Sequence, residues 1–262
     1  MTIGWAELLL AIAWIGPFTF AGFFTLIERK YPDGQYPKES HVKVNFLFGG
    51  MTALISFCFL QTMQDSIGAT MSVFDFVDFS DPVLPEILHY SLCFLFIDFV
   101  YYAQHRLSHH ISLLWRLHKV HHGDDRVTAS TSLVHHPLEA IFVSATAFSI
   151  YVLVNMPLGV ILSYGAVNAV HVAFVHSNIT MPRRLEWSLS KIIYTPRLHK
   201  IHHSIRMDEG NSNFGMIFVI WDQMLRSWRS SACVSHEALQ MGIEDFKHPR
   251  WNMTKLLLLP FK

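Results

Sequence analysis

The stretch Asp98-Phe-Val-Tyr-Tyr-Ala-Gln-His105-Arg-Leu-Ser-His109 joins a long apolar block to a polar region rich in histidine. We expect it to continue the apolar helix past the face of a membrane, which places His105 and His109 one turn apart on the same side. Two imidazoles in this arrangement can share one metal ion. Asp98 precedes His105 by seven residues and so lies on a similar face, where its carboxylate could accept the second ring N–H of a ligand and fix its tautomer.

Two further histidine clusters share one pattern. The segments His118-Lys-Val-His121-His122 and His199-Lys-Ile-His202-His203 both have the form HxxHH, with histidines at positions i, i+3 and i+4. Together with His105 and His109 they supply eight imidazoles, more than the four donors that one tetrahedral zinc ion uses. The count therefore favours two metal ions.

Histidine, and not cysteine, is the candidate ligand type. The chain has 17 histidines, and 13 of them lie between His105 and His203. The three cysteines are scattered and form no CxxC pair, which argues against a disulfide framework and against a thiolate metal site. Imidazole suits zinc, copper, iron and nickel.

Two histidines outside these clusters are predicted as additional ligands. His136, in the segment His136-Pro-Leu-Glu139, and His176 stand at the two ends of the next apolar region, at the depth expected for the metal ions. His110, His135 and His171 each neighbour a better candidate and are interpreted as structural.

Some polar side chains could support the ligands without binding metal. Glu139 could hydrogen-bond a ligand imidazole or relay a proton, and Asn178 could orient His176, although helix capping is an equal alternative for both. The full set of these supporting candidates is Asp98, Glu139, Asn178, Asp208 and Asp222.

The distribution of apolar residues predicts an integral membrane protein. Half of the chain is hydrophobic and only 15% is charged. Three apolar blocks, at about residues 3–27, 44–67 and 85–103, approach or exceed the roughly 20 residues that a membrane helix needs. A fourth region, at about residues 138–175, is too long for one crossing and is broken around Pro157, which indicates a hairpin. No basic residue precedes the first block, so we expect it to be retained and not cleaved as a secretory signal.

The expected fold is therefore all-α, with about four transmembrane helices arranged as two hairpins and with the histidine clusters beyond the membrane face. Residues 1–97 are assigned to the membrane anchor. Residues 98–230 form the catalytic region, which includes the second membrane hairpin at residues 137–177. Residues 231–262 form a C-terminal cap over the core or a tail on the membrane surface.

The loop charges predict an orientation. Arg29, Lys30, Lys38 and Lys43 follow the first apolar block, whereas the loop after the second block has acidic residues and no basic ones. The positive-inside rule then places every histidine cluster on the cytoplasmic side of a bacterial inner membrane or of an organelle such as the endoplasmic reticulum. His89, at the start of the third block, is expected at the opposite face.

Histidine-bound metal ions beside a bilayer suggest a reaction class. A redox-active iron pair can reduce dioxygen and produce an oxidant that takes hydrogen from an unactivated C–H bond, while apolar surroundings exclude water. The expected substrate is a lipid. Lys plus Arg and Asp plus Glu both number 20, so net charge gives no reason to expect nucleic acid as a partner.

The motifs resemble those of the fatty acid hydroxylase and sterol desaturase superfamily of membrane di-iron oxygenases. The resemblance covers residues 98–222. It rests on the motifs at residues 98–109, 115–122, 136–139, 176–178, 195–204 and 213–222. After Trp221-Asp222 this chain continues Gln-Met-Leu-Arg, where such proteins often have a Phe-Gly-Thr type of turn, a departure that bears on subfamily and not on metal binding.

The resemblance implies a four-helix membrane anchor under a cytoplasmic cap, two non-haem iron ions and dioxygen as co-substrate. The implied iron ligands are His105, His109, His118, His121, His122, His199, His202 and His203. The sequence has no GxGxxG after a strand, no CxxC pair and no c-type haem site, so we expect electrons from a separate ferredoxin or b-type cytochrome system.

The leading hypothesis is a hydroxylase that inserts one oxygen atom into an acyl, alkyl or sterol carbon. A desaturase with the same iron site is the alternative within this class. A metal transporter would place its ligands near the midplane of the membrane, whereas these clusters lie at helix ends. A degenerate lipid-binding member would have lost some of the eight core histidines, and none is lost here.

Overall fold

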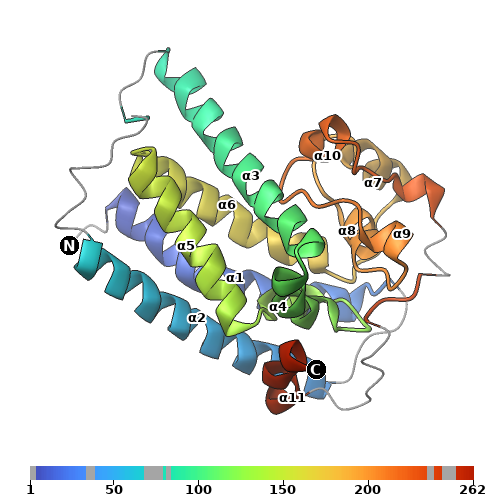
Figure 1. Ribbon diagram of the computed structural model, residues 1–262. Coiled ribbons are helices and arrows are strands. Elements are labelled where there is room, and N and C mark those ends of the chain that lie inside the picture. The colour runs from blue at the N-terminus through green and yellow to red at the C-terminus, as the bar shows by residue number, and fades with distance from the viewer. Residues whose placement is uncertain (1–3, 34–38, 68–78, 81–83, 235–238, 244–251) are drawn as a thin grey trace.

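The computed structural model describes residues 4–33, 39–67, 79–80, 84–234, 239–243 and 252–262. The long helices lie together on one side of the molecule (Figure 1): α1 (Trp5–Lys30), α2 (Glu39–Ile67), α3 (Glu86–His110), α5 (Pro137–Leu153) and α6 (Leu158–His176). The other helices are short: α4 (Ser112–His122), α7 (Arg183–Leu189), α8 (Pro196–His202), α9 (Met207–Gly210), α10 (Ile220–Met224) and α11 (Met253–Leu258), with 3-10 turns η2 (Ala129–Leu133), η3 (Ser231–Cys233) and η4 (Leu259–Phe261). The described part of the chain contains isolated β-bridges but no β-strands, so the all-α class is confirmed.

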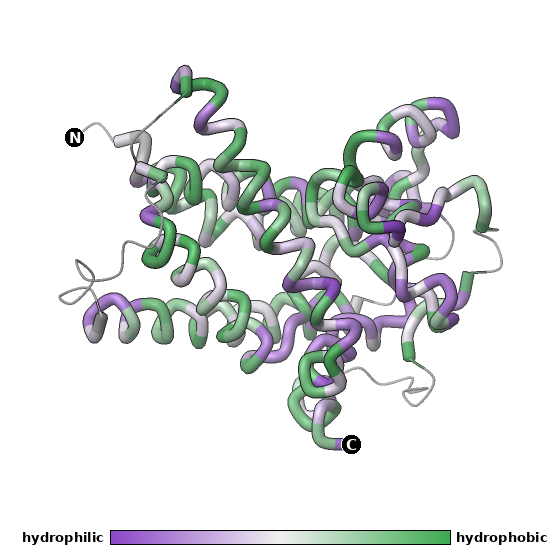
Figure 2. The backbone as a smooth tube through the Cα atoms, turned by 45° about the horizontal axis from the view of Figure 1, so that its top comes forward, coloured by the Kyte–Doolittle hydropathy of each residue, from purple (hydrophilic) through white to green (hydrophobic). Residues whose placement is uncertain are grey.

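Four of the long helices are long and apolar enough to cross a membrane. These segments are Glu7–Lys30, His41–Ser66, Glu86–His110 and Leu158–His176, and α5 is a shorter apolar helix. The extended helices carry long apolar stretches, while hydrophilic segments concentrate around the short helices (Figure 2). The fourth apolar region is divided as predicted, because α5 ends at Leu153, Asn155 adopts a positive φ of 42° and Pro157 precedes α6. Helix α3 continues to His110, as predicted from the stretch at residues 98–109.

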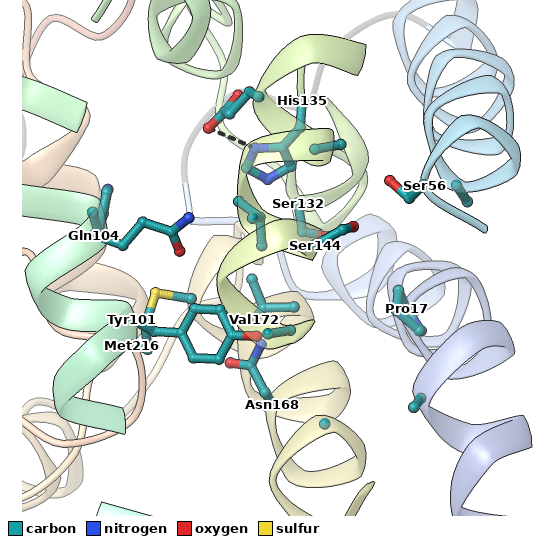
Figure 3. A pocket seen from close by; sticks show the side chains of 18 of the residues that line it. Pro17, Ser56, Tyr101, Gln104, Ser132, His135, Ser144, Asn168, Val172 and Met216 are labelled. Atoms are coloured by element: carbon teal, nitrogen blue, oxygen red, sulfur yellow. Dashed lines mark ion pairs between the residues drawn. The ribbon is translucent and has the colours of Figure 1, made fainter. Parts of the chain in front are cut away.

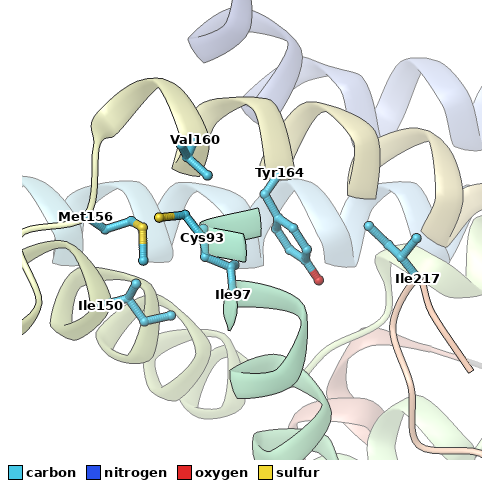
Figure 4. Packing of buried hydrophobic residues seen from close by; sticks show 7 residues of the cluster. All are labelled: Cys93, Ile97, Ile150, Met156, Val160, Tyr164 and Ile217. Carbon is cyan, nitrogen blue, oxygen red and sulfur yellow. The ribbon is translucent and has the colours of Figure 1, made fainter. Parts of the chain in front are cut away.

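The long helices pack in pairs around an interior space. Helix α1 lies along α6, α2 lies along α5, and α3 leans against α6. An apolar cluster joins α3 to the α5–α6 connection (Figure 4), and its members are Cys93, Ile97, Ile150, Met156, Val160, Tyr164 and Ile217. This packing fixes the position of α3, which carries two of the candidate ligands.

Two adjacent glycines in α2 have opposite surroundings, which gives a matched stability test. A Cβ added at Gly49 would meet the Leu133 Cβ at 2.7 Å, whereas one added at Gly50 would meet nothing within 4 Å. We expect Gly49→Ala to displace η2 and lower the free energy of unfolding by about 1–3 kcal/mol. Gly50→Ala is expected to be neutral or to stabilise the protein by up to about 1 kcal/mol, because alanine favours helix. Thermal unfolding in detergent compares the two, and equal effects would contradict the close approach of α2 and η2.

The C-terminal segment packs onto the core. Leu256 of α11 and Leu259 are buried in a cluster with Phe48, Val120 and Val134, while Leu258 and Phe261 are exposed. Val120 belongs to α4, so the tail covers the back of a helix that carries three candidate ligands.

Candidate metal centre

Nine histidines gather in two neighbouring groups. Each histidine contributes one ring nitrogen, and the contributed nitrogens of a group all lie within 4.8 Å of one another. The first group draws on α3, α4 and α8: His105, His109, His118, His122 and His202. The second group draws on α4, α6 and the end of α8: His121, His176, His199 and His203. The structure thus brings together the eight histidines of the three sequence clusters and adds His176.

The two HxxHH segments contribute to the groups in opposite ways. In α4, His118 and His122 face the first group and His121 faces the second. In the segment 199–203, His199 and His203 face the second group and His202 faces the first. The rings of His122 and His203 stack with centroids 4.3 Å apart, so the groups lie side by side. Each motif therefore links both groups.

Backbone carbonyls fix the tautomer of several rings. Four of the candidate ligand rings direct Nδ1 at a carbonyl oxygen: His105 at Phe214 (2.7 Å), His121 at Val134 (3.2 Å), His176 at Val172 (2.7 Å) and His202 at Ser212 (2.9 Å). A carbonyl oxygen can only accept, so the proton of each neutral ring is on Nδ1. Each Nε2 then carries a lone pair that is available to a metal ion.

In each group two of these lone pairs face one another. The Nε2 atoms of His105 and His118 are 3.1 Å apart in the first group, and those of His121 and His176 are 3.0 Å apart in the second. The Glu139 carboxylate holds the Nδ1 of His118 at 2.6 Å, so each neutral ring in these pairs directs an Nε2 lone pair at the other. Two buried acceptors at this distance repel, and a shared cation removes the repulsion. The arrangement fits one metal ion in each group.

Burial keeps five of the candidate ligand rings neutral. It lowers the pKa of His202 to about 3 and lowers the pKa of His121, His122, His199 and His203 well below the usual value for histidine. The Nε2 atoms of His109 and His202 are buried and have no hydrogen-bond partner among the described residues. Neutral imidazoles with unpartnered nitrogens are the form in which histidine binds metal.

Glu139 lies where the sequence suggested, against a ligand imidazole. One of its oxygens accepts from His118 and lies 3.2 Å from the Nδ1 of His135, an ion pair drawn in Figure 3. The other oxygen is buried without a partner among the described residues. The ring of His135 also stacks on His121 at a centroid distance of 4.4 Å. His135 therefore touches the centre, although it was predicted to be structural and its neighbour His136 to be a ligand.

The structure does not bring His136 to either group. Its Nδ1 accepts from the backbone N–H of Leu138 and so caps the start of α5, which turns the ring away from the centre. Asn178, expected to orient His176, accepts a hydrogen bond from Lys200 instead. Asp208 is exposed and pairs with Arg206 and Arg229. These contacts are structural and lie outside the two groups.

Asp98 and Asp222 hold the segment that follows α9. The expected contact of Asp98 with a ligand ring is not formed, because its carboxylate faces away from the histidines and accepts from four donors: Tyr164 (2.9 Å), the backbone of Ile217 (3.1 Å) and Phe218 (3.3 Å), and Trp221 (2.8 Å). Asp222 accepts from the backbone of Phe214 at 2.9 Å, and the Phe214 carbonyl in turn receives the ring N–H of His105. Asp222 therefore supports a ligand through one intervening residue.

We expect Asp98→Ala to destabilise the protein strongly. It leaves four donors without their acceptor, and each buried, unpaired donor costs about 1–3 kcal/mol. The expected loss is at least about 3 kcal/mol in the free energy of unfolding, with a smaller loss for Asp98→Asn, which keeps one acceptor oxygen. Denaturation followed by tryptophan fluorescence measures both variants. An Asp98→Ala protein as stable as the wild type would contradict the bracing role.

A cavity of about 560 Å³ extends from the histidines into the space between the long helices. Its wall includes His105 and His118 of the first group and His121, His176 and His199 of the second. The remaining wall comes mainly from α1, α2, α3, α5 and α6, with contributions from η2 and Met216, and is mainly apolar. Figure 3 shows part of this wall. Both groups of nitrogens therefore open onto one apolar space.

The fold and the site together define a class of membrane protein. Two histidine groups, each suited to bind a metal ion, lie at the end of an apolar cavity. A model of the fatty acid hydroxylase family matches residues 90–227, just over half of the chain. The chain belongs to this family, and the resemblance inferred from its motifs is confirmed. No solved structure matches the chain at a significant level.

The curated relatives carry names of lipid-modifying enzymes. The chain is 37% identical over 133 residues to an ornithine lipid hydroxylase of Rhizobium tropici, which covers 51% of this chain and 39% of the relative. It is 26% identical over 186 residues to an alkylglycerol monooxygenase of Danio rerio, covering 70% and 41%. A very-long-chain aldehyde decarbonylase of Oryza sativa is 27% identical over 162 residues, covering 57% and 25%. The chain thus spans well under half the length of these relatives.

Proposed function

We propose that the protein is a dioxygen-dependent, non-haem di-iron enzyme that hydroxylates a C–H bond of a lipid. The observation that carries this proposal is the pair of facing lone pairs in each histidine group, at the end of an apolar cavity. Two bound iron ions would supply the reduction of dioxygen and the removal of hydrogen from an unactivated carbon. The proposed ligands are the nine grouped histidines.

The side chains around the iron ions have three tasks in this proposal. The backbone carbonyls and Glu139 orient the ligand rings and keep the proton on Nδ1. The apolar wall excludes water and holds a lipid chain against the histidines. The carboxylate of Glu139, which lines the cavity, holds the Nδ1 proton of His118 beside the first group.

The names of the relatives favour hydroxylation over desaturation. The hydroxylase and the monooxygenase support insertion of oxygen, and both names refer to lipids. We propose a separate electron donor, a ferredoxin or a b-type cytochrome system, because the sequence carries no nucleotide or haem motif. We also propose that the histidine groups face the cytoplasm, since Arg29 and Lys30 end α1 at the end of the bundle that holds the histidines.

Isotopically labelled dioxygen tests the proposal. Iron-loaded protein in lipid nanodiscs is supplied with ferredoxin, its reductase and NADPH, and the lipids are analysed by mass spectrometry. Gain of one labelled oxygen atom is expected, whereas loss of two hydrogens without label would identify a desaturase. His176→Ala is the inactive control. No change in any lipid, with iron bound and reduced, would contradict the proposed function.

A further inference from the structure

One polar atom in the wall of the apolar cavity has no hydrogen-bond partner among the described residues. Asn168 of α6 lines the cavity and points into it (Figure 3). Its Oδ1 is buried and receives no hydrogen bond from the described residues. A buried amide oxygen without a donor costs free energy, and buried polar groups in proteins are nearly always paired. A donor on a molecule bound in the cavity would pair this oxygen.

A second acceptor lies on the stretch of α1 that lines the cavity. Pro17 has no N–H, so the carbonyl of Ala13, four residues earlier, lacks its usual helical partner. Ala13 and Pro17 both line the cavity, and a Cβ added at Gly165, one turn from Asn168, would lie 3.4 Å from the Ala13 Cβ. The part of α1 that carries this carbonyl therefore lies beside the turn of α6 that precedes Asn168.

The position of Asn168 sets the distance from the histidines. It precedes His176 by eight residues on α6, which corresponds to about 12 Å along the helix axis. The hydroxyl-bearing side chain of Tyr101, on α3, also points into this part of the cavity (Figure 3). Between Asn168 and His176 the cavity wall on α6 is formed by Val172 and Val175. Along α6, a bound chain that starts at His176 would thus meet apolar side chains for about two helical turns before it reaches Asn168.

We propose that Asn168 determines substrate specificity by accepting a hydrogen bond from a hydroxyl or amide N–H carried part-way along the lipid. This inference rests on the proposed function, because it names a feature of the lipid that occupies the same cavity. The substrate class is a lipid with a hydrogen-bond donor about 12 Å from the carbon held at the histidines. A site that pairs a buried acceptor with a substrate donor discriminates strongly against chains that lack the donor.

Binding without turnover tests the inference. Iron-loaded protein in detergent micelles, kept without reductant, is filled with a pyrene-labelled stearoyl lipid, and its displacement by competitors is followed by fluorescence. The competitors are methyl stearate, a series of methyl hydroxystearates with the hydroxyl moved along the chain, their methyl ethers, and chains with one internal amide. We expect one hydroxyl position to bind about tenfold more tightly than methyl stearate, with the matching ether showing no gain.

Two variants of α6 complete the test. Asn168→Leu is expected to reduce the preference for the hydroxylated chain to less than about twofold and to bind methyl stearate at least as well as the wild type. Val167→Ala, on an exposed position next to it, is the control and is expected to keep the preference. No preferred donor position in the wild type, or an unchanged preference in Asn168→Leu, would overturn the inference. Either result leaves the oxidation assay unaffected, so the two proposals fail separately.

Discussion

Replacing one histidine in each group of the metal centre is expected to remove the iron ions separately. His202→Ala takes a donor from the first group and His199→Ala takes one from the second, although both residues lie on α8. Each variant should purify with about one iron ion per chain, and the double variant with none. Metal analysis of detergent-purified protein gives the iron content, and lipid oxidation should fall below detection in all three variants, since the proposed reaction uses both ions.

His110→Ala is the matched control for this series. His110 follows His109 directly, but it is exposed, its Nδ1 bonds the Arg106 carbonyl and it belongs to neither group. Its replacement should leave iron content and lipid oxidation near the wild-type values. A double variant that keeps two iron ions, or a His110→Ala protein that loses iron, would contradict the assignment of ligands.

The helices that hold the site were predictable because their signal is local. Apolar blocks of spanning length place α1, α2 and α3, and Pro157 divides the fourth block, without reference to any other part of the chain. The i, i+4 spacing of His105 and His109 likewise follows from helix geometry alone. These features depend on neighbours in sequence, so one sequence is sufficient to predict them.

The division of the histidines between two groups was not predictable. Both HxxHH segments look alike in sequence. In each of them, however, the middle histidine, His121 or His202, belongs to a different group from the histidines on either side of it. Which nitrogen faces which group depends on how α4 and α8 pack against α3 and α6. The choice between His135 and His136 is of the same kind, because the N-cap geometry of α5 decides which ring points inward. A histidine directly before a proline at a helix start is the local signal that would have suggested a cap.

Buried charges that connect distant segments were also missed. Glu28, at the end of α1, is fully buried and accepts from the backbone N–H of Ala129 (3.0 Å) and Asn178 (2.7 Å). Lys200, inside the second HxxHH segment, is buried and donates to Asp33 (2.9 Å) and Asn178 (2.8 Å). These pairs join residues more than 20 positions apart. An acidic residue at the end of an apolar block gives no sequence signal of where its partner lies.

Glu139→Gln is expected to retain iron but slow lipid oxidation about 10- to 100-fold, the usual cost of removing a group that orients a metal-bound histidine. The nine histidines remain, so both groups can still fill. The carboxylate, however, accepts a hydrogen bond from the Nδ1 of His118 at 2.6 Å and faces His135. A neutral amide in its place makes the His118 ring a weaker ligand for the metal ion. Loss of iron to a chelator should therefore quicken for the first group and stay unchanged for the second.

Two further variants separate this role from a general effect of charge. Glu139→Asp keeps the charge but withdraws it from His118 by one methylene, so its oxidation rate should lie between those of the wild type and Glu139→Gln. Asp208→Asn removes an exposed carboxylate that pairs with Arg206 and should leave the oxidation rate and chelator kinetics unchanged. If Glu139→Gln behaved like Asp208→Asn, the His118 contact would have no influence on the metal. If both iron ions left Glu139→Gln equally fast, the variant would act on the fold and not on one group.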